Sequence, residues 1–244
     1  MAWSARYGTV SPIEDVTDSV VRSLGEGVEA VVFDLDGVLV DSEPIWDEAR
    51  RDLVSRHGGT WLPAATRDMM GMSSREWSAY MHDTLGVSLP VKQISREVAN
   101  FVDQRYAERL PFLPGAPEAV QRLAHRWPLG LASSSNRTII DRFLEASGLR
   151  SSFAVTVSSE EVERGKPAPD VYVAAAARLG AATSRCVAIE DSTNGIRAAA
   201  AATMTVIAVP NAAFPPSADA LGLADLVLPD LSSLTVETVN GAGG

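Results

Sequence analysis

The sequence predicts an α/β protein built on a doubly wound parallel sheet, with a small helical domain inserted after the first strand. Two observations lead to this prediction. From Leu113 onward, short apolar segments of strand length alternate with amphipathic segments of helix length. Between about residues 44 and 110 the pattern is helical and contains no convincing strand. Strands joined by helices run parallel, because each crossover returns the chain to the same end of the sheet.

The individual elements follow from the apolar pattern and from the residues that end helices. We expect strands at residues 31–33, 128–132, 153–157, 186–189, 205–209 and 226–228, and core helices at residues 116–126, 136–147, 169–179 and 192–202. Gly148 and Gly180 stand where two of these helices should end, since glycine adopts the left-handed conformation found there. The chain is therefore divided into a core of residues 28–43 and 112–236 and a helical insert of residues 44–111.

The two ends of the chain are expected to lie outside these domains. In the extension formed by residues 1–27, Ser11, Pro12 and Glu14 are typical of a helix start. Apolar residues then recur on one helical face, so we expect one amphipathic helix that packs on the body of the protein. Residues 237–244 include a glycine-rich end and are expected to form a flexible tail.

Composition limits the classes of partner. The 244 residues are 46% hydrophobic, which is enough for a sizeable core. A net charge of −10 argues against nucleic acid or an anionic membrane as partner, because both favour a basic face. We find no apolar segment of membrane-spanning length and no signal peptide. Cys186 is the only cysteine, so no intramolecular disulfide can form, which is consistent with a cytoplasmic protein. We expect the protein to be a monomer.

Two acidic residues, Asp34 and Asp36, directly follow the first predicted strand and precede Gly37. Ligands of open α/β sheets bind outside the carboxyl ends of the strands, so both carboxylates should face the binding crevice. An aspartate can attack phosphorus and form an acyl phosphate. A second carboxylate close to the first keeps its proton more readily and can act as a general acid. The alternative is a solvated turn, in which Asp and Gly are common.

Three other predicted strand ends carry groups that phosphoryl transfer needs. The segment 131–136 offers serine hydroxyls and the N–H groups of a helix start, which can hold a phosphate, although serine also caps helices. Pro167 and Pro169 fix the segment around Lys166, whose charge can then offset that of a phosphoryl group. The alternative is that Lys166 is a surface lysine in a proline-rich loop. Glu190 and Asp191 can hold Mg²⁺ together with Asp34 and Asp36, because Mg²⁺ prefers oxygen ligands. The alternative explanation is that they simply precede the capped start of a helix.

Together these segments resemble the haloacid dehalogenase superfamily, in its branch of β-phosphoglucomutase-like proteins and small sugar-phosphate phosphatases. The resemblance runs from about residue 29 to 233 and rests mainly on residues 33–42, 165–170 and 190–195. It implies a Rossmann-like core. It also implies that the helical insert is the cap of that family, which closes over the site and helps to choose the substrate.

The resemblance implies a catalytic role for four residues. Asp34 matches the nucleophile and Asp36 the acid/base. Ser133 matches the hydroxyl that holds the phosphoryl group, and Lys166 matches the lysine that offsets its charge.

The resemblance also implies a Mg²⁺ site. Asp191 matches the metal-binding acid, with Glu190 assisting, and the backbone carbonyl of Asp36 is a further ligand beside Asp34. The expected cofactor is therefore Mg²⁺, held by these four residues.

Three residues are expected to bind the substrate. Arg75 resembles a cap arginine that contacts a distal phosphate or another polar group, although it is equally explained as a solvated charge on a helix. Ser134 and Asn136 follow the phosphate-holding serine and are expected to contact a small phosphate ester.

The choice of reaction depends on three positions. Asp36 favours a phosphate ester, since the dehalogenase branch lacks this acid and the phosphonate-hydrolysing branch has a small residue there. Trp46 and Met70 stand where the mutases of this branch usually carry a histidine and a lysine. We therefore predict a Mg²⁺-dependent phosphatase that acts on a sugar phosphate or similar metabolite. A β-phosphoglucomutase-type isomerase is the alternative, and a non-catalytic phosphate-binding regulatory module is a remote one.

Overall fold

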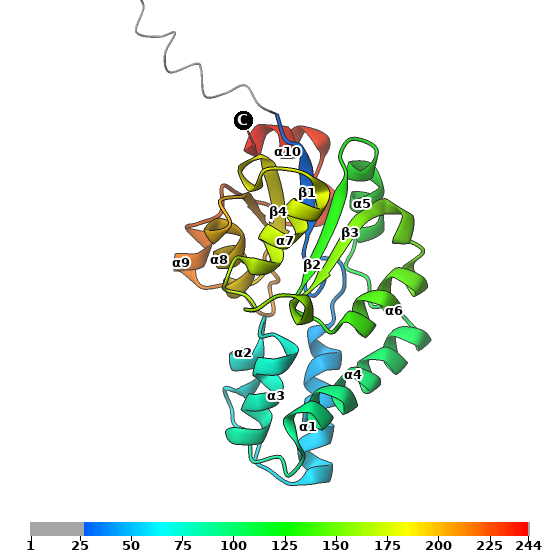
Figure 1. Ribbon diagram of the computed structural model, residues 1–244, viewed down its shortest axis with the longest axis vertical. Helices are drawn as coiled ribbons and strands as arrows, with labels where there is room; N and C mark the ends of the chain where they lie inside the picture. The colour runs from blue at the N-terminus through cyan, green and yellow to red at the C-terminus, as the bar shows by residue number, and fades with distance from the viewer. Residues whose placement is uncertain (1–26, 244) are drawn as a thin grey trace, which may run out of the picture.

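The computed structural model describes residues 27–243 (Figure 1), so the helix expected in the N-terminal extension lies outside the described residues. Six strands form one parallel sheet in the order β3-β2-β1-β4-β5-β6. They are β1 (Ala30–Phe33), β2 (Leu129–Ser133), β3 (Phe153–Ser158), β4 (Cys186–Glu190), β5 (Thr205–Ala208) and β6 (Leu226–Val227). The predicted doubly wound α/β fold is confirmed, and every strand end lies within about one residue of its predicted position.

The central strands are buried on both faces, which explains their unbroken apolar sequences. In β1, Val31 and Phe33 pack into the core on one face of the sheet, and Ala30 and Val32 pack into the core on the other. This arrangement is typical of parallel sheets covered by helices on both sides. The sheet therefore separates two apolar layers, and polar side chains are concentrated at the strand ends.

Helices cover both faces of this sheet. The core helices are α5 (Ala116–Ala124), α6 (Arg137–Ser147), α7 (Asp170–Leu179), α8 (Thr193–Ala201), α9 (Ala218–Leu221) and α10 (Val236–Ala242). The short 3-10 helices are η2 (Arg150–Ser152), η3 (Ser159–Glu161), η4 (Thr183–Arg185) and η5 (Leu231–Ser233). Helices α5, α6 and α10 pack on the face that contains Phe33, and α7, α8 and α9 pack on the other. Between residues 27 and 243, no helix has both the length and the apolar character needed to cross a membrane.

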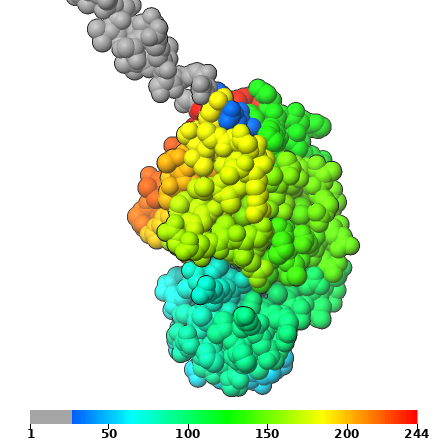
Figure 2. Space-filling model, viewed as in Figure 1, coloured from blue at the N-terminus to red at the C-terminus, as the bar shows by residue number. Residues whose placement is uncertain are grey.

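The segment after β1 forms a separate lobe of four helices (Figures 1 and 2). These are α1 (Glu43–His57), α2 (Ala65–Met69), α3 (Ser74–Asp83) and α4 (Val91–Glu108). Trp46 and Trp77 pack edge to face in its interior, with ring centroids 5.9 Å apart. An ion pair between Arg142 of α6 and Asp103 of α4 (Nε–Oδ1 2.7 Å) joins this lobe to the core.

The expectation of a flexible tail at residues 237–244 is wrong for residues 237–242, because these residues belong to α10. Thr235 caps the helix, and its hydroxyl accepts a hydrogen bond from the N–H of Thr238. Val239 is fully buried in the core, with Val236 and Ala242 packed beside it. Burial of these apolar side chains stabilises a helix that would be too short to persist alone.

Candidate active site

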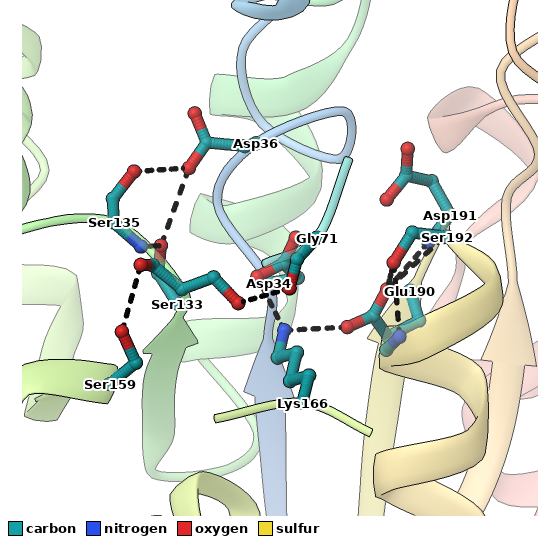
Figure 3. Close-up of polar contacts among 12 residues, drawn as sticks. Asp34, Asp36, Gly71, Ser133, Ser135, Ser159, Lys166, Glu190, Asp191 and Ser192 are labelled. Atoms are coloured by element: carbon teal, nitrogen blue, oxygen red, sulfur yellow. Dashed lines mark hydrogen bonds and ion pairs between the residues drawn. The ribbon is translucent and has the colours of Figure 1, made fainter. Parts of the chain in front are cut away.

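The acidic residues that follow two neighbouring strands meet at the carboxyl end of the sheet (Figure 3). In the parallel pair β1 and β4, Phe33 lies opposite Ile189. The backbone N–H of Asp34 donates a hydrogen bond to the carbonyl of Ile189 (3.0 Å), which places Asp34 beside Glu190 at the end of β4. Strand pairing thus brings together acids that are far apart in the sequence.

Lys166 lies between these two acids. Its Nζ is 2.7 Å from Oδ1 of Asp34 and 2.6 Å from Oε1 of Glu190. The hydroxyl of Tyr172 also donates to Oε1 of Glu190 (2.7 Å). Burial alone would lower the pKa of Lys166, but the charges of Asp34 and Glu190 outweigh it and raise that pKa. Lys166 is therefore a permanently charged, buried cation, and the surface-lysine alternative is wrong.

Three buried acids, Asp34, Glu190 and Asp191, lie around this one lysine, which is paired with only the first two, so acidic groups outnumber basic ones at the site. Burial raises the pKa of Asp34 to about 8, although Lys166 opposes the shift, while Glu190 and Asp36 add to it. Burial, reinforced by Glu190 and Asp34, also raises the pKa of Asp191 well above its usual range. A bound divalent cation would offset this charge and favour the ionised carboxyl groups.

The arrangement of these acids fits a divalent cation. One carboxylate oxygen from each of Asp34, Glu190 and Asp191 lies within 4.8 Å of the others. Oδ1 of Asp191 is buried and accepts no hydrogen bond, so it is free to bind an ion. Gly37 allows the close approach, because a Cβ at this position would lie 2.0 Å from Oδ2 of Asp191, and its φ is +84°. Hard oxygen donors of this kind suit Mg²⁺.

Glu190 differs from the other two acids, since both of its oxygens are already engaged. Oε1 accepts from Lys166 and Tyr172, and Oε2 accepts from the N–H groups of Asp191 (3.0 Å) and Ser192 (3.2 Å). It is thus held rigidly next to the possible ion site. Gly195 is needed there, because a Cβ at that position would overlap the Glu190 carboxylate.

Asp36 is held by four donors rather than pointing freely into solvent. Ser42 Oγ (2.5 Å) and Trp46 Nε1 (3.1 Å) donate to its Oδ1. Ser133 Oγ (3.3 Å) and Ser135 Oγ (2.7 Å) donate to its Oδ2 (Figure 3). Of these donors, Trp46 belongs to α1 of the lobe and Ser42 directly precedes that helix, so the lobe and the strand ends position this carboxylate together.

The structure brings most, but not all, of the predicted site residues together. Ser134 lines the same pocket as Asp34 and Lys166, and its hydroxyl donates to the carbonyl of Gly71 (3.0 Å). Arg75 and Asn136 instead line a neighbouring cavity between the insert and the core. Helix α3 presents Arg75 on an exposed face, while the amide of Asn136 donates to Glu160 Oε1 (2.8 Å). Substrate binding by these three residues stays a prediction.

A family model described as haloacid dehalogenase-like hydrolase matches residues 28–203. The chain belongs to this family. The predictions of a haloacid dehalogenase fold and of a hydrolase are confirmed.

Several relatives of this hydrolase carry names of phosphatases. Hexitol phosphatase B of Escherichia coli (strain K12) is 34% identical over 230 residues, which cover 87% of this chain and 96% of that protein. Phosphorylated carbohydrates phosphatase of Thermotoga maritima is 32% identical over 177 residues, covering 72% of this chain and 82% of that protein. A crystal structure of CbbY from Rhodobacter sphaeroides with phosphate superposes with a TM-score of 0.77, covering 88% of this chain and 99% of that chain. At 24% identity it supports the fold alone.

Several residues that line this pocket of the hydrolase were not predicted as site residues from the sequence, among them Glu43, Trp46, Arg50 and Ser135. Ser135 follows two serines, and no local signal distinguishes its role from theirs. In the sequence, Trp46 is marked only by standing where the mutases usually carry a histidine, yet in the structure its Nε1 donates to Asp36. Glu43 and Arg50 line the pocket from α1, where charged residues on an amphipathic helix are more often solvated. Only the packing of the insert turns them toward the site.

Proposed function

We propose that this hydrolase is a Mg²⁺-dependent phosphatase that acts on a small phosphorylated metabolite, such as a sugar phosphate, through an aspartyl-phosphate intermediate. The observation that carries the proposal is the buried contact of Asp34 with Lys166 (Oδ1–Nζ 2.7 Å) in a pocket bordered by Asp36. A carboxylate nucleophile, a fixed cation and a second carboxyl group are what phosphoryl transfer to an aspartate requires. The names of the relatives support the reaction class.

In the proposed reaction, an oxygen of Asp34 attacks phosphorus and the bond from phosphorus to the ester oxygen breaks. Asp36 donates its proton to that oxygen, so the alcohol leaves as a neutral molecule. Asp36 then accepts a proton from the water that attacks the aspartyl phosphate, which releases inorganic phosphate and restores Asp34. Lys166 offsets the charge on the phosphoryl oxygens, and the Ser133 hydroxyl donates a hydrogen bond to one of them.

We propose that Asp34 and Asp191 hold Mg²⁺ through carboxylate oxygens and Asp36 through its backbone carbonyl. Glu190 supports them by fixing the backbone of Asp191 and Ser192. When bound, the ion supplies positive charge that the buried acids and the phosphoryl oxygens share.

Asp191→Asn is expected to weaken Mg²⁺ binding at least about 100-fold, because it removes a charged ligand from a buried site. The measurement is the Mg²⁺ concentration needed for half-maximal activity, together with the rise in Tm that Mg²⁺ produces. Asp219→Asn is the matched control, since Asp219 is exposed and paired with Arg197. An unchanged Mg²⁺ requirement in Asp191→Asn would contradict the proposed site.

Trp46→Phe is expected to lower kcat about three- to tenfold with little change in KM, because one donor to Asp36 is lost while the aromatic packing on Trp77 is kept. The decrease in kcat should be smaller with p-nitrophenyl phosphate, because its leaving group needs no proton from Asp36. Trp61→Phe is the control, since Trp61 lies outside this pocket and its Nε1 makes no hydrogen bond. Equal deficits on both kinds of substrate would show that Trp46 does not act through the acid/base.

The test of the proposed function is phosphate release across a panel of sugar phosphates with Mg²⁺, with product identification for hexose 1-phosphates. Inorganic phosphate as the main product supports a phosphatase. Conversion of β-glucose 1-phosphate to glucose 6-phosphate, primed by a trace of the bisphosphate, would favour the mutase instead. Absence of turnover across the whole panel would favour a regulatory phosphate-binding module.

We propose that the hydrolase acts as a monomer in the cytoplasm. The large apolar side chains that are most exposed among residues 27–243 are Val173, Leu223 and Val227. Val173 lies on α7, Leu223 in the turn after α9 and Val227 on β6, so no single helix or strand presents an exposed apolar face made of them, which supports a monomer. The one cysteine, Cys186, is buried and free. Burial raises its pKa to about 11, so it is a poorly reactive thiol.

A further inference from the structure

An ion pair of the insert borders the proposed active site. Glu43 and Arg50 lie seven residues apart on α1, and therefore on one face of the helix. Both line the pocket that contains Asp34 and Lys166. Nη1 of Arg50 is 3.1 Å from Oε1 of Glu43, and the two side chains are only 5% and 16% exposed, respectively. This pair is far less hydrated than an ordinary ion pair on a helix surface.

The guanidinium of Arg50 is held in place by two aromatic rings. Its Cζ lies 5.4 Å from the ring centroid of Trp46 and 5.4 Å from that of Trp77. Its Nε is buried and makes no hydrogen bond, so the group retains donor capacity. The Trp46 ring that contacts Arg50 also donates to Asp36, the proposed acid for the leaving oxygen. The ion pair is thus next to the place where the alcohol part of a substrate would leave.

The described side chains that line the pocket supply no unpaired cation for a second anionic group. Among the described residues that line it, the only lysine and arginine are Lys166 and Arg50. Lys166 is paired with Asp34 and Glu190, and Arg50 is paired with Glu43. The remaining charged groups at this pocket are acidic, so a second phosphate or a carboxylate on the substrate would meet net repulsion.

Glu43 can also exchange hydrogen bonds with hydroxyl groups. Burial raises its pKa to about 7, Arg50 opposes this shift, and Asp36 adds to it. Near neutral pH its oxygens can accept from hydroxyls, and in its protonated form it can also donate. Polar groups that hydrogen-bond a substrate hydroxyl discriminate strongly against analogues that lack it.

We infer that Glu43 and Arg50 recognise the alcohol part of the substrate, and that they select an uncharged polyhydroxyl group esterified to a single phosphate over one that bears a second anion. Glu43 repels the second anion, while Arg50, fixed between the two tryptophans, presents donors to hydroxyl oxygens. This inference rests on the proposed phosphatase function and adds its substrate class.

The experiment compares glucose 6-phosphate with glucose 1,6-bisphosphate, which differ by one phosphate. The wild-type enzyme should show the higher kcat/KM for the monophosphate. Glu43→Gln removes the negative charge with little change of shape, and it should reduce this preference about tenfold, mainly by lowering KM for the bisphosphate. Glu48→Gln is the matched control, since Glu48 lies on the same helix but is exposed and paired with Arg105. It should leave the preference unchanged.

Arg50→Lys provides a second test that keeps the positive charge. It should raise KM for glucose 6-phosphate about tenfold, because the planar fork of donors is lost, and the rise in KM should be clearly smaller for p-nitrophenyl phosphate, whose alcohol part offers no sugar hydroxyls. A wild type that hydrolyses both glucose esters equally well, or a preference that Glu43→Gln leaves unaltered, would overturn the inference while the phosphatase stands. Failure to release phosphate from any ester would instead overturn the proposed function.

Discussion

Asp34→Asn is expected to reduce phosphate release about 10⁴-fold or more, while the protein remains folded. The amide is a far weaker nucleophile than the carboxylate, and loss of a nucleophile commonly removes nearly all of the turnover. The rate should be measured with saturating Mg²⁺ on the best ester of the panel, and a phosphate-labelled protein should be sought by mass spectrometry in wild type and variant. Asp141→Asn, at an exposed aspartate of α6, is the control for purification and for the loss of one acid.

The same variant should be more stable than wild type in metal-free buffer. The pKa of Asp34 rises from 3.8 to about 8 in the folded protein. A raised carboxyl pKa means that the native state binds the proton more tightly, so this group lowers stability progressively as pH increases between those two values. The amide introduced by Asp34→Asn does not titrate. At about pH 8 we expect Tm to rise by about 2–4 °C, or about 1 kcal/mol, and the gain to vanish near about pH 4.

These two measurements separate catalysis from folding. A variant that loses activity and gains metal-free stability fits a nucleophile buried among other acids. Activity retained in a preparation free of contaminating phosphatase would exclude Asp34 as the nucleophile. Loss of activity accompanied by a lower Tm at every pH would indicate that the aspartate has a structural role instead.

Lys166→Met is expected to destabilise the protein by about 3–5 kcal/mol, because it leaves two buried carboxylates without their cation. Lys166 holds both Asp34 and Glu190, at 2.7 and 2.6 Å. Its loss also removes the main influence that lowers the pKa of Asp34. The loss of unfolding free energy should therefore be larger at about pH 8 than at about pH 5. A higher pKa of Asp34 in the native state lowers stability as pH rises, because the unfolded chain releases this proton more readily. Denaturant unfolding at both pH values is the measurement.

Activity should fall about 10²- to 10³-fold in Lys166→Met, even under conditions where the variant is folded, because a fixed charge on the phosphoryl oxygens is lost. Lys92→Met is the control, since Lys92 is exposed on α4 and lines the neighbouring cavity rather than this pocket. A Lys166→Met variant with normal stability would mean that the carboxylates find another partner. Normal activity would remove Lys166 from the proposed mechanism.

The core elements could be predicted because their signals are local. The strands that end at Phe33 and Glu190 are apolar segments bounded by acids, and helices end at Gly148 and Gly180 in the left-handed conformation that glycine adopts readily. Helix α10 gave no comparable signal, because its stability depends on the contact of Val239 with a distant part of the core. Local propensity does not report such contacts.

The candidate site could be predicted only in part. Asp34, Lys166 and Asp191 stand in motifs at strand ends, and parallel strands bring such ends to one edge of the sheet. For the insert, the sequence pointed to Arg75 as the cation facing the substrate. The structure places Arg75 on an exposed helix face beside the neighbouring cavity, where substrate binding by it stays a prediction, and it places Arg50 in the pocket.

By itself, the sequence determined the alternation of strands and helices, the position of the insert and the acids and lysine that the strand ends present. These features depend on apolar periodicity and on the fixed geometry of a parallel sheet. Only the tertiary structure decided that Asp34 and Glu190 share Lys166, that Trp46 holds Asp36, and that the Glu43–Arg50 pair borders the pocket. The physical reason is that the rotation of a helix about its axis depends on how its apolar face packs against other elements, and no local pattern encodes those partners.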